Sequence, residues 1–232
     1  MRLSRSKIEL YFDCPRCFYM DVVMKVSRPS TFPLNLNNAV DLLMKKEFDG
    51  YRQQGTPHPI QTGSAAGFIG SAHPMLDCWR SLKSGGLTYF NPKHDCTYYG
   101  IIDDLWVNKK NQYVIVDYKS TAKEKPVEEL PTWGEGYKRQ LSFYNYLLKK
   151  NDFETLNFGF FVYATAIITK NQFHNKLEFI TNLIKVELDD TWVENILDEI
   201  QNLLQTNNIP DKNKSCKHCL YTESINRIIK KN

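Results

Sequence analysis

Two pairs of cysteines at opposite ends of the chain constrain its fold more than any other sequence feature. Cys14 and Cys17 lie near the start, and Cys216 and Cys219 lie near the end, with two residues inside each pair. The chain starts without the apolar segment of an export signal, so we expect it in the cytoplasm, where such pairs bind a metal rather than form disulfides. Together they complete a four-sulfur site for Zn²⁺ or an iron-sulfur cluster. The two ends of the chain must then meet in space.

The length of 232 residues suits one domain with one large core, so we predict a single domain over 1–232. Within it, 1–20 and 207–232 jointly form a metal-binding staple, and the metal would close a loop of nearly the whole domain. Cys78 and Cys96 have no partner at this spacing and are interpreted as buried small side chains. The net charge of +4 permits a nucleic-acid partner without requiring one, and no apolar run approaches the ~20 residues of a membrane span.

Residues 98–120 have the pattern of a β-hairpin. Both arms are rich in Ile, Val, Tyr and Trp, and the polar run 108–111 separates them. Folded about this turn, Asp103 lies almost opposite Asp117, and Lys119 shares a strand face with Asp117 because side chains alternate. Two opposed carboxylates repel unless something positive lies between them. The group suits Mg²⁺ or Mn²⁺, with the lysine holding or polarising a water. The alternative is a solvated hairpin face with an ordinary Asp-Lys pair.

The spacing of apolar side chains predicts the other elements. We expect helices at 7–13, 36–52, 75–82, 136–150 and 191–205, strands at 157–168 and 178–189, and a long loop at 55–73. Capping pairs mark two of the helix starts, Ser6 with Glu9 and Thr191 with Glu194. This order of elements predicts an α/β fold with a central mixed sheet of four or five strands flanked by helices.

Three short motifs follow one another along the chain. They are GxxD at residues 100–103, DYK at 117–119 and QxxxY at 140–144. In these motifs the chain resembles the RecB-like branch of the PD-(D/E)XK nuclease superfamily, whose motifs are GxxD, [DE]xK and QxxxY. The resemblance implies a restriction-endonuclease-like core and metal-dependent cleavage of DNA. The usual activity of the branch is that of an exonuclease on single-stranded DNA or DNA ends.

The resemblance also implies roles for the residues of the hairpin. Asp103, Asp117 and the backbone carbonyl of Tyr118 would hold one or two Mg²⁺ or Mn²⁺ ions. Lys119 would orient or activate the water that attacks the scissile phosphate, while the charge of the metal stabilises the developing oxyanion.

Further residues of the expected site lie on helices. Gln140 and Tyr144 share one helix face, and by the resemblance they line the cleft and help to position the DNA backbone or the catalytic groups. By periodicity alone Tyr144 is a core aromatic residue. In relatives an acidic residue or histidine on an early helix can complete the metal site, which suggests Asp49 or Glu47 here. The alternative for both is a solvated charged face.

Iron-sulfur members of this branch include AddB-type nucleases and the exonucleases of CRISPR adaptation. They carry an early Cys-Pro pair and a late pattern of three cysteines. This chain matches the early cysteine and the first two late ones, but Ile225 stands near the place of the last, so we expect Cys17 to supply the missing ligand. The resemblance favours a [4Fe-4S] cluster. Zn²⁺ stays open because two CxxC pairs are also the commonest zinc arrangement.

The expected partner of the protein is DNA, with no membrane involved. The chain has no room for a helicase, so opening of a duplex would need a helicase or another DNA-repair, recombination or CRISPR-adaptation partner. One alternative is a non-catalytic nucleic-acid-binding or scaffold module with a structural zinc or iron-sulfur site. A second is a nuclease that acts on RNA, although nothing in the sequence is suited to reading a 2′-hydroxyl.

Overall fold

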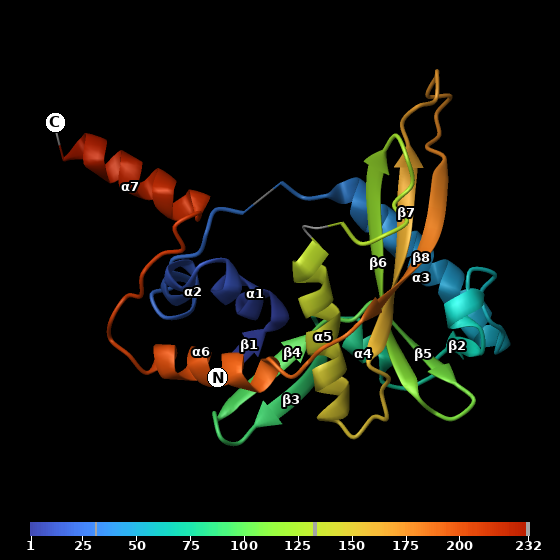
Figure 1. Cartoon of the computed structure of the whole chain (residues 1–232), viewed down its shortest axis with the longest axis horizontal. Helices are drawn as coiled ribbons and strands as arrows, with labels where there is room; N and C mark the ends of the chain where they lie inside the picture. Colours follow the sequence, from blue (N-terminus) through green and yellow to red (C-terminus); the bar gives the residue numbers. More distant parts are fainter. Residues whose placement is uncertain (31, 132–133, 231–232) are drawn as a thin grey trace. The chain divides into compact units, whose positions relative to one another are not determined.

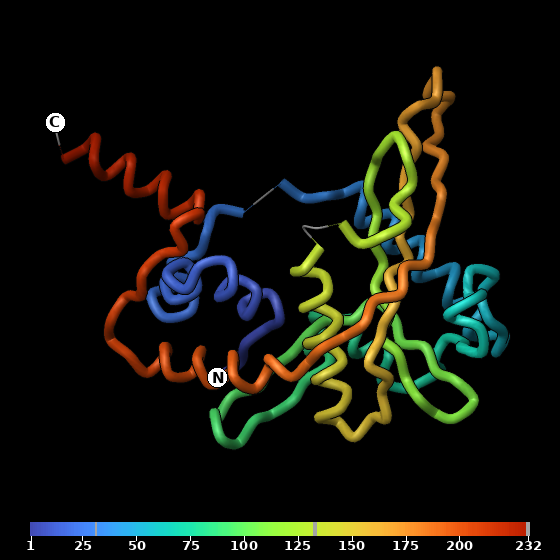
Figure 2. Tube along the Cα trace, in the orientation of Figure 1, coloured from blue at the N-terminus to red at the C-terminus, as the bar shows by residue number. Residues whose placement is uncertain are grey.

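The computed structural model describes residues 1–30, 32–131 and 134–230. The chain divides into two compact units. Unit 1 combines Met1–Phe32, Phe90–Tyr98 and Thr191–Asn232, and unit 2 combines Pro33–Tyr89 and Tyr99–Asp190. Within unit 1 the segment around residues 13–16 contacts the segment around residues 213–223, and Figure 2 shows the blue N-terminal helices beside the start of the last red helix. Whether both units fold as one domain stays a prediction.

Unit 2 is built on a five-stranded mixed sheet with the strand order β2-β5-β6-β7-β8 (Figure 1). Its strands are β2 (Phe68–Gly70), β5 (Asp104–Asn108), β6 (Tyr113–Lys123), β7 (Phe158–Ile167) and β8 (Phe179–Glu187). Strands β6 and β7 pair in parallel, and the other neighbours are antiparallel. A parallel pair needs a crossover connection, and helix α5 (Glu135–Lys149) lies within it. The predicted α/β fold with a central mixed sheet is confirmed.

Helices α3 (Asn35–Gln54) and α5 cover opposite faces of this sheet (Figure 1). Phe48 of α3 packs against the Tyr118 ring, with 5.3 Å between the ring centroids, while Gln140 of α5 reaches Asp117. Asp117 and Tyr118 are consecutive in β6, so their side chains point to opposite faces. The α3 face also holds Trp106, which is fully buried and stacks on Phe48. This alternation decides which hairpin residues meet which helix.

Unit 1 contains four helices and a share of a second sheet in the described part of the chain. The helices are α1 (Arg5–Asp13), α2 (Pro15–Val22), α6 (Val193–Leu204) and α7 (Lys217–Ile229). The sheet has the order β1-β4-β3, with β1 (Arg2–Ser4), β3 (Leu87–Asn91) and β4 (Cys96–Gly100). Strands β3 and β4 each run from one unit into the other. Helices α2 and α7 and strands β1, β2 and β3 are additions to the elements predicted from the sequence.

The first arm of the predicted hairpin is not one continuous strand. Strand β4 ends at Gly100 and β5 starts at Asp104, and the two belong to different sheets. Between them the backbone leaves strand pairing: the Ile102 amide donates to the Trp79 carbonyl, and Arg80 Nε donates to the Asp103 carbonyl. Helix α4 (Leu76–Trp79) lies beside this break and provides the Trp79 carbonyl. The hairpin of β5 and β6 itself is present.

Three smaller predictions also need correction. Helix α1 is capped by Ser4, whose Oγ accepts from the Lys7 amide at 3.3 Å, instead of by Ser6. Helix α6 begins after Trp192 without a side-chain cap, instead of at Thr191. The expected loop at 55–73 contains strand β2, which is held by antiparallel pairing with β5. Such pairing depends on tertiary neighbours, which local spacing does not reveal.

Asp104 is the polar centre of the α3 face. Its side chain is fully buried and accepts hydrogen bonds from the Tyr118 hydroxyl at 2.6 Å and the Trp106 indole at 3.2 Å. Arg80 lies 3.0 Å from Asp104 Oδ1, and Arg52 of α3 also pairs with it. One buried carboxylate thus connects α3, the segment after α4, β5 and β6.

Asp104→Asn is expected to lower the free energy of unfolding by about 3 kcal/mol, because two buried guanidinium groups lose a negative partner. Urea denaturation followed by circular dichroism measures this loss. Asp152→Asn is the matched control, because Asp152 is exposed at a φ of 62°, a conformation that Asn tolerates. Equal stability of the two variants would show that Asp104 is not the centre of this face.

Candidate functional site

The register of β5 and β6 brings Asp103 and Asp117 opposite each other. Asp104 pairs with Val116 in an antiparallel register, so Asp103, one residue earlier, faces Asp117, one residue later. Asp103 Oδ2 accepts a hydrogen bond from the Tyr118 amide at 3.1 Å. Its Oδ1 accepts from Lys45 Nζ of α3 at 2.8 Å. The structure therefore contains the opposed carboxylates that the sequence predicts.

Asp117 is buried on the α5 side of β6, with 1% of its surface exposed. Its Oδ1 accepts from Gln140 Nε2 at 2.9 Å. Its Oδ2 is in ion-pair contact with Lys119 Nζ. Burial raises the pKa of Asp117 to about 7, Lys119 opposes the rise, and the Asp103 charge adds to it. Two neighbouring carboxylates, one of them buried, repel each other, and a cation beside them would relieve the repulsion.

Lys119 is the positive group beside these carboxylates. Burial opposes its charged form, but Asp117 and Asp103 outweigh burial, so the pKa of Lys119 is raised. Its Nζ also lies 4.8 Å from the centroid of the Tyr137 ring and 5.8 Å from that of Phe161. In this environment Lys119 is an ammonium group, which donates hydrogen bonds and does not accept a proton.

Gln140 and Tyr144 reach the same carboxylate from α5. Gln140 Nε2 lies 3.2 Å from the Tyr144 hydroxyl as well as 2.9 Å from Asp117. The Tyr144 ring is buried against Gly100, where an added Cβ would lie 2.3 Å from the ring. Only glycine at position 100 leaves room for this ring. This contact explains sterically why the first residue of the GxxD motif is a glycine. All three motifs therefore converge on Asp117.

The structure places the other predicted acidic candidates elsewhere. Asp49 receives two hydrogen bonds from Arg80, at 2.8 and 3.0 Å, and a further contact from Arg52. Glu47 Oε1 lies 2.9 Å from His58 Nε2. The arginines tie Asp49 to the Asp104 network on the α3 face. A role for Asp49 as a metal ligand stays a prediction.

Two residues of α3 join the site although sequence reasoning did not select them. Lys45 Nζ bridges Asp41 Oδ2 at 2.9 Å and Asp103 Oδ1 at 2.8 Å. Burial raises the pKa of Asp41, the Asp103 charge adds to the rise, and Lys45 and Lys119 oppose it. Asp41 is therefore close enough to the carboxylates to feel their charge. The four-residue spacing of Asp41 and Lys45 was visible in the sequence, but the approach of α3 to Asp103 was not.

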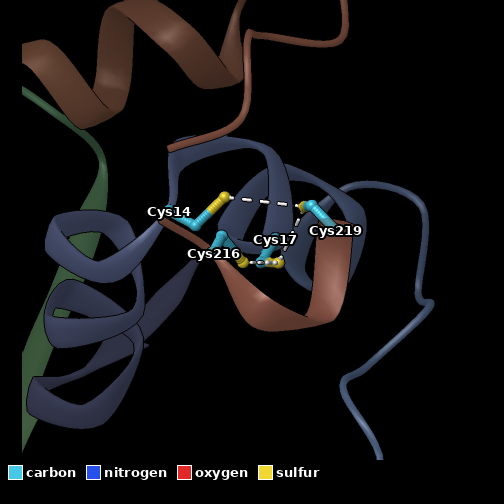
Figure 3. A group of neighbouring side chains, drawn as sticks. All are labelled: Cys14, Cys17, Cys216 and Cys219. Atoms are coloured by element: carbon cyan, nitrogen blue, oxygen red, sulfur yellow. Dashed lines mark hydrogen bonds between the residues drawn. The ribbon is translucent and has the colours of Figure 1, made fainter. Parts of the chain in front are cut away.

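A second cluster lies in unit 1, where the four predicted cysteines meet. Their sulfur atoms all lie within 4.8 Å of one another, and the four side chains point toward one another in Figure 3. Cys14 is the N-cap of α2 and Cys216 is the N-cap of α7, so each CxxC pair occupies a helix start. All four are buried and free. The prediction that both chain ends meet at a potential four-cysteine metal site is confirmed.

No helix in the described part of the chain has the length and apolar character that a membrane crossing requires.

Comparisons with known proteins bear on the family. None of the curated proteins matches the sequence. One similar solved structure is the crystal structure of SSO0001, with 20% sequence identity and a TM-score of 0.29. The match covers 55% of this chain and spans about half, 50%, of that protein. The family model described as PD-(D/E)XK nuclease superfamily matches residues 2–224. Because this match covers nearly the whole chain, the protein belongs to the PD-(D/E)XK nuclease superfamily.

Proposed function

We propose that the protein is a metal-dependent deoxyribonuclease of the RecB-like branch, acting as an exonuclease on single-stranded DNA or DNA ends. The observation that carries the proposal is the pair of opposed carboxylates, Asp103 and Asp117, with Lys119 in ion-pair contact with Asp117. The superfamily match supports hydrolysis of phosphodiester bonds. The choice of DNA and the exonuclease mode extend the resemblance of the three motifs to this chain.

The residues of the site fit a divalent cation. Three carboxylates, from Asp41, Asp103 and Asp117, surround two ammonium groups, from Lys45 and Lys119, and leave a net negative charge when all are ionised. Asp103, Asp117 and the Tyr118 carbonyl would hold the ion, and Asp41 is a further candidate ligand. Their hard oxygen atoms suit Mg²⁺ or Mn²⁺. When bound, such an ion supplies positive charge to the phosphate oxygens and lowers the pKa of a bound water.

The protein's own side chains divide the remaining work. Lys119, whose pKa Asp117 and Asp103 raise, would donate a hydrogen bond to the attacking water or to a phosphate oxygen. Gln140 holds Asp117 Oδ1, which leaves Oδ2 directed toward Lys119 and the site. Tyr144 in turn fixes Gln140. Gln140 and Tyr144 are thus positioning residues for the carboxylate.

Cleavage of labelled DNA is expected to require Mn²⁺ or Mg²⁺ and to fall at least about a hundredfold in Asp117→Ala and Lys119→Ala, because each removes a charge that acts on the transition state. The measurement compares single- and double-stranded DNA with RNA of the same sequence, in metal or EDTA. The exposed residues Asp211→Ala and Lys109→Ala are matched controls. DNA binding without cleavage of any substrate would favour the non-catalytic module, and preferential cleavage of RNA would overturn the choice of DNA.

Asp117→Asn is expected to stabilise the metal-free protein at pH 8 by about 1–3 kcal/mol. The folded protein binds the Asp117 proton with a pKa of about 7, against 3.8 for an ordinary aspartate. Wild-type stability therefore falls as pH rises between these values, and the cost is fully present above pH 7. The uncharged amide that Asp117→Asn introduces has no such cost in the free energy of unfolding. The charge of Asp103 still stabilises the Lys119 ammonium in the variant.

Denaturation of both proteins in EDTA at pH 5 and pH 8 measures this difference, which should shrink at the lower pH. Added Mg²⁺ should stabilise the wild type and leave Asp117→Asn unchanged. A variant less stable than the wild type at pH 8 would show that the Lys119 ion pair outweighs the burial of the carboxylate.

Asp41→Asn is expected to raise the Mn²⁺ concentration for half-maximal cleavage about tenfold, because an oxygen with negative charge leaves the site. Asp49→Asn is the matched control on the same helix and should leave the Mn²⁺ requirement unchanged, since Asp49 pairs with Arg80 and Arg52. Cleavage titrated with Mn²⁺ distinguishes the two. The opposite result would assign the helix ligand to Asp49.

A further inference from the structure

The four sulfur atoms in unit 1 lie too close together for the cluster that the family resemblance favours. Cys14 Sγ lies 3.8 Å from Cys219 Sγ, and Cys17 Sγ lies 3.6 Å from the sulfur atoms of both Cys216 and Cys219 (Figure 3). These three contacts connect all four residues. No pair of sulfur atoms in the group is separated by more than 4.8 Å.

The distance between the thiolate sulfur atoms depends on whether they bind a single metal ion or a larger cluster. Four thiolates on one tetrahedral Zn²⁺, with Zn-S bonds of about 2.3 Å, lie about 3.8 Å from one another. In a [4Fe-4S] cluster each thiolate binds a different iron, so the sulfur atoms stand outside the cube, roughly 6 Å apart. A [2Fe-2S] cluster would keep only two close pairs, with roughly 6 Å between thiolates on different irons.

We propose that the four cysteines hold a single Zn²⁺ ion rather than a [4Fe-4S] cluster. The close sulfur contacts match one tetrahedral ion and leave no room for a cube. A thiolate site of this kind binds zinc more tightly than ferrous iron, following the general order of divalent metal affinities. The site closes with protein ligands alone, which is the arrangement of a structural centre.

The surroundings of the cysteines favour bound thiolates. Each pair lies at a helix start, where backbone amides and the helix dipole stabilise negative charge. The Asn213 amide donates to Cys14 Sγ at 3.4 Å, and Arg28 Nη2 donates to Cys216 Sγ at 3.6 Å. Four thiolates around one Zn²⁺ carry two excess negative charges, and the guanidinium of Arg28 offsets part of them.

The ion would join segments of unit 1 that are far apart in sequence. Cys14 and Cys17 come from the start of α2, and Cys216 and Cys219 come from the start of α7, about 200 residues later. Around the site, Arg16 of α2 pairs with Glu223 of α7 at 3.0 Å, but both side chains are partly exposed. An exposed ion pair contributes little stability. The Zn²⁺ would therefore be the main connection between α2 and α7.

Elemental analysis of the untagged full chain tests the proposal. The protein is purified without air from cells supplied with both iron and zinc, and its metal and acid-labile sulfide are measured. We expect about one zinc per chain, no sulfide and no visible absorption. Iron in any stoichiometry, with or without sulfide, would overturn the proposal, and so would four free thiols without metal.

Variants locate the ion and separate it from the nuclease site. Cys216→Ser should lose the zinc, whereas the matched control Cys78→Ser should keep it, because Cys78 lies outside the cluster. Asp117→Asn should keep a full equivalent of zinc while losing cleavage. Zinc content is measured without an activity assay, so the zinc proposal can be tested even if the nuclease proposal fails. Loss of zinc in Asp117→Asn would place the ion at the carboxylates and overturn the proposal.

Cobalt substitution uses the wild-type protein, so its result does not depend on whether a variant folds. Co²⁺ in place of the ion should show the intense visible and near-ultraviolet bands of a tetrahedral cobalt-thiolate centre. The weak spectrum of octahedral cobalt with oxygen ligands would contradict the four-cysteine assignment.

Discussion

The electrostatic conflict between Asp103 and Asp117 is the constraint on which the rest of the site depends. Strand pairing places two carboxylates opposite each other, and burial of Asp117 prevents water from screening them. Lys119 relieves the conflict from the same strand, and Lys45 relieves it from α3. The groups that reduce the repulsion are lysines, whose charge is concentrated at one atom.

Asp103 and Asp104 show how one step along a strand changes the use of a carboxylate. Asp104 points to the α3 face, where Arg52 and Arg80 surround it with forked donors and where the Tyr118 hydroxyl closes the set. A carboxylate satisfied in this way has little capacity left for a ligand. Asp103 meets one lysine, Lys45 of α3, and the backbone amide of Tyr118. Arginines therefore surround the fully bonded carboxylate, whereas a lysine contacts the carboxylate of the candidate site.

How much of the site could be predicted from the sequence depends on how far apart the interacting residues are in the chain. The opposition of Asp103 and Asp117 follows from the turn and from alternation, which are local, so the sequence predicts it. The meeting of the cysteines was also predictable, because identical CxxC spacing at both ends is typical of ligands that share one metal centre. The approach of Lys45 to Asp103 and the break between β4 and β5 depend on how α3 and α4 pack. No local pattern encodes that packing.

The types of the ligand residues alone do not identify the metal at the cysteine site. Two CxxC pairs suit zinc and iron-sulfur clusters equally, and only the distance between sulfur atoms separates one ion from a cube of four irons. The carboxylate site differs in kind, because its hard oxygen ligands and mixed charges favour Mg²⁺ or Mn²⁺ over a soft thiophilic ion. The two sites would therefore sort their metals by ligand chemistry.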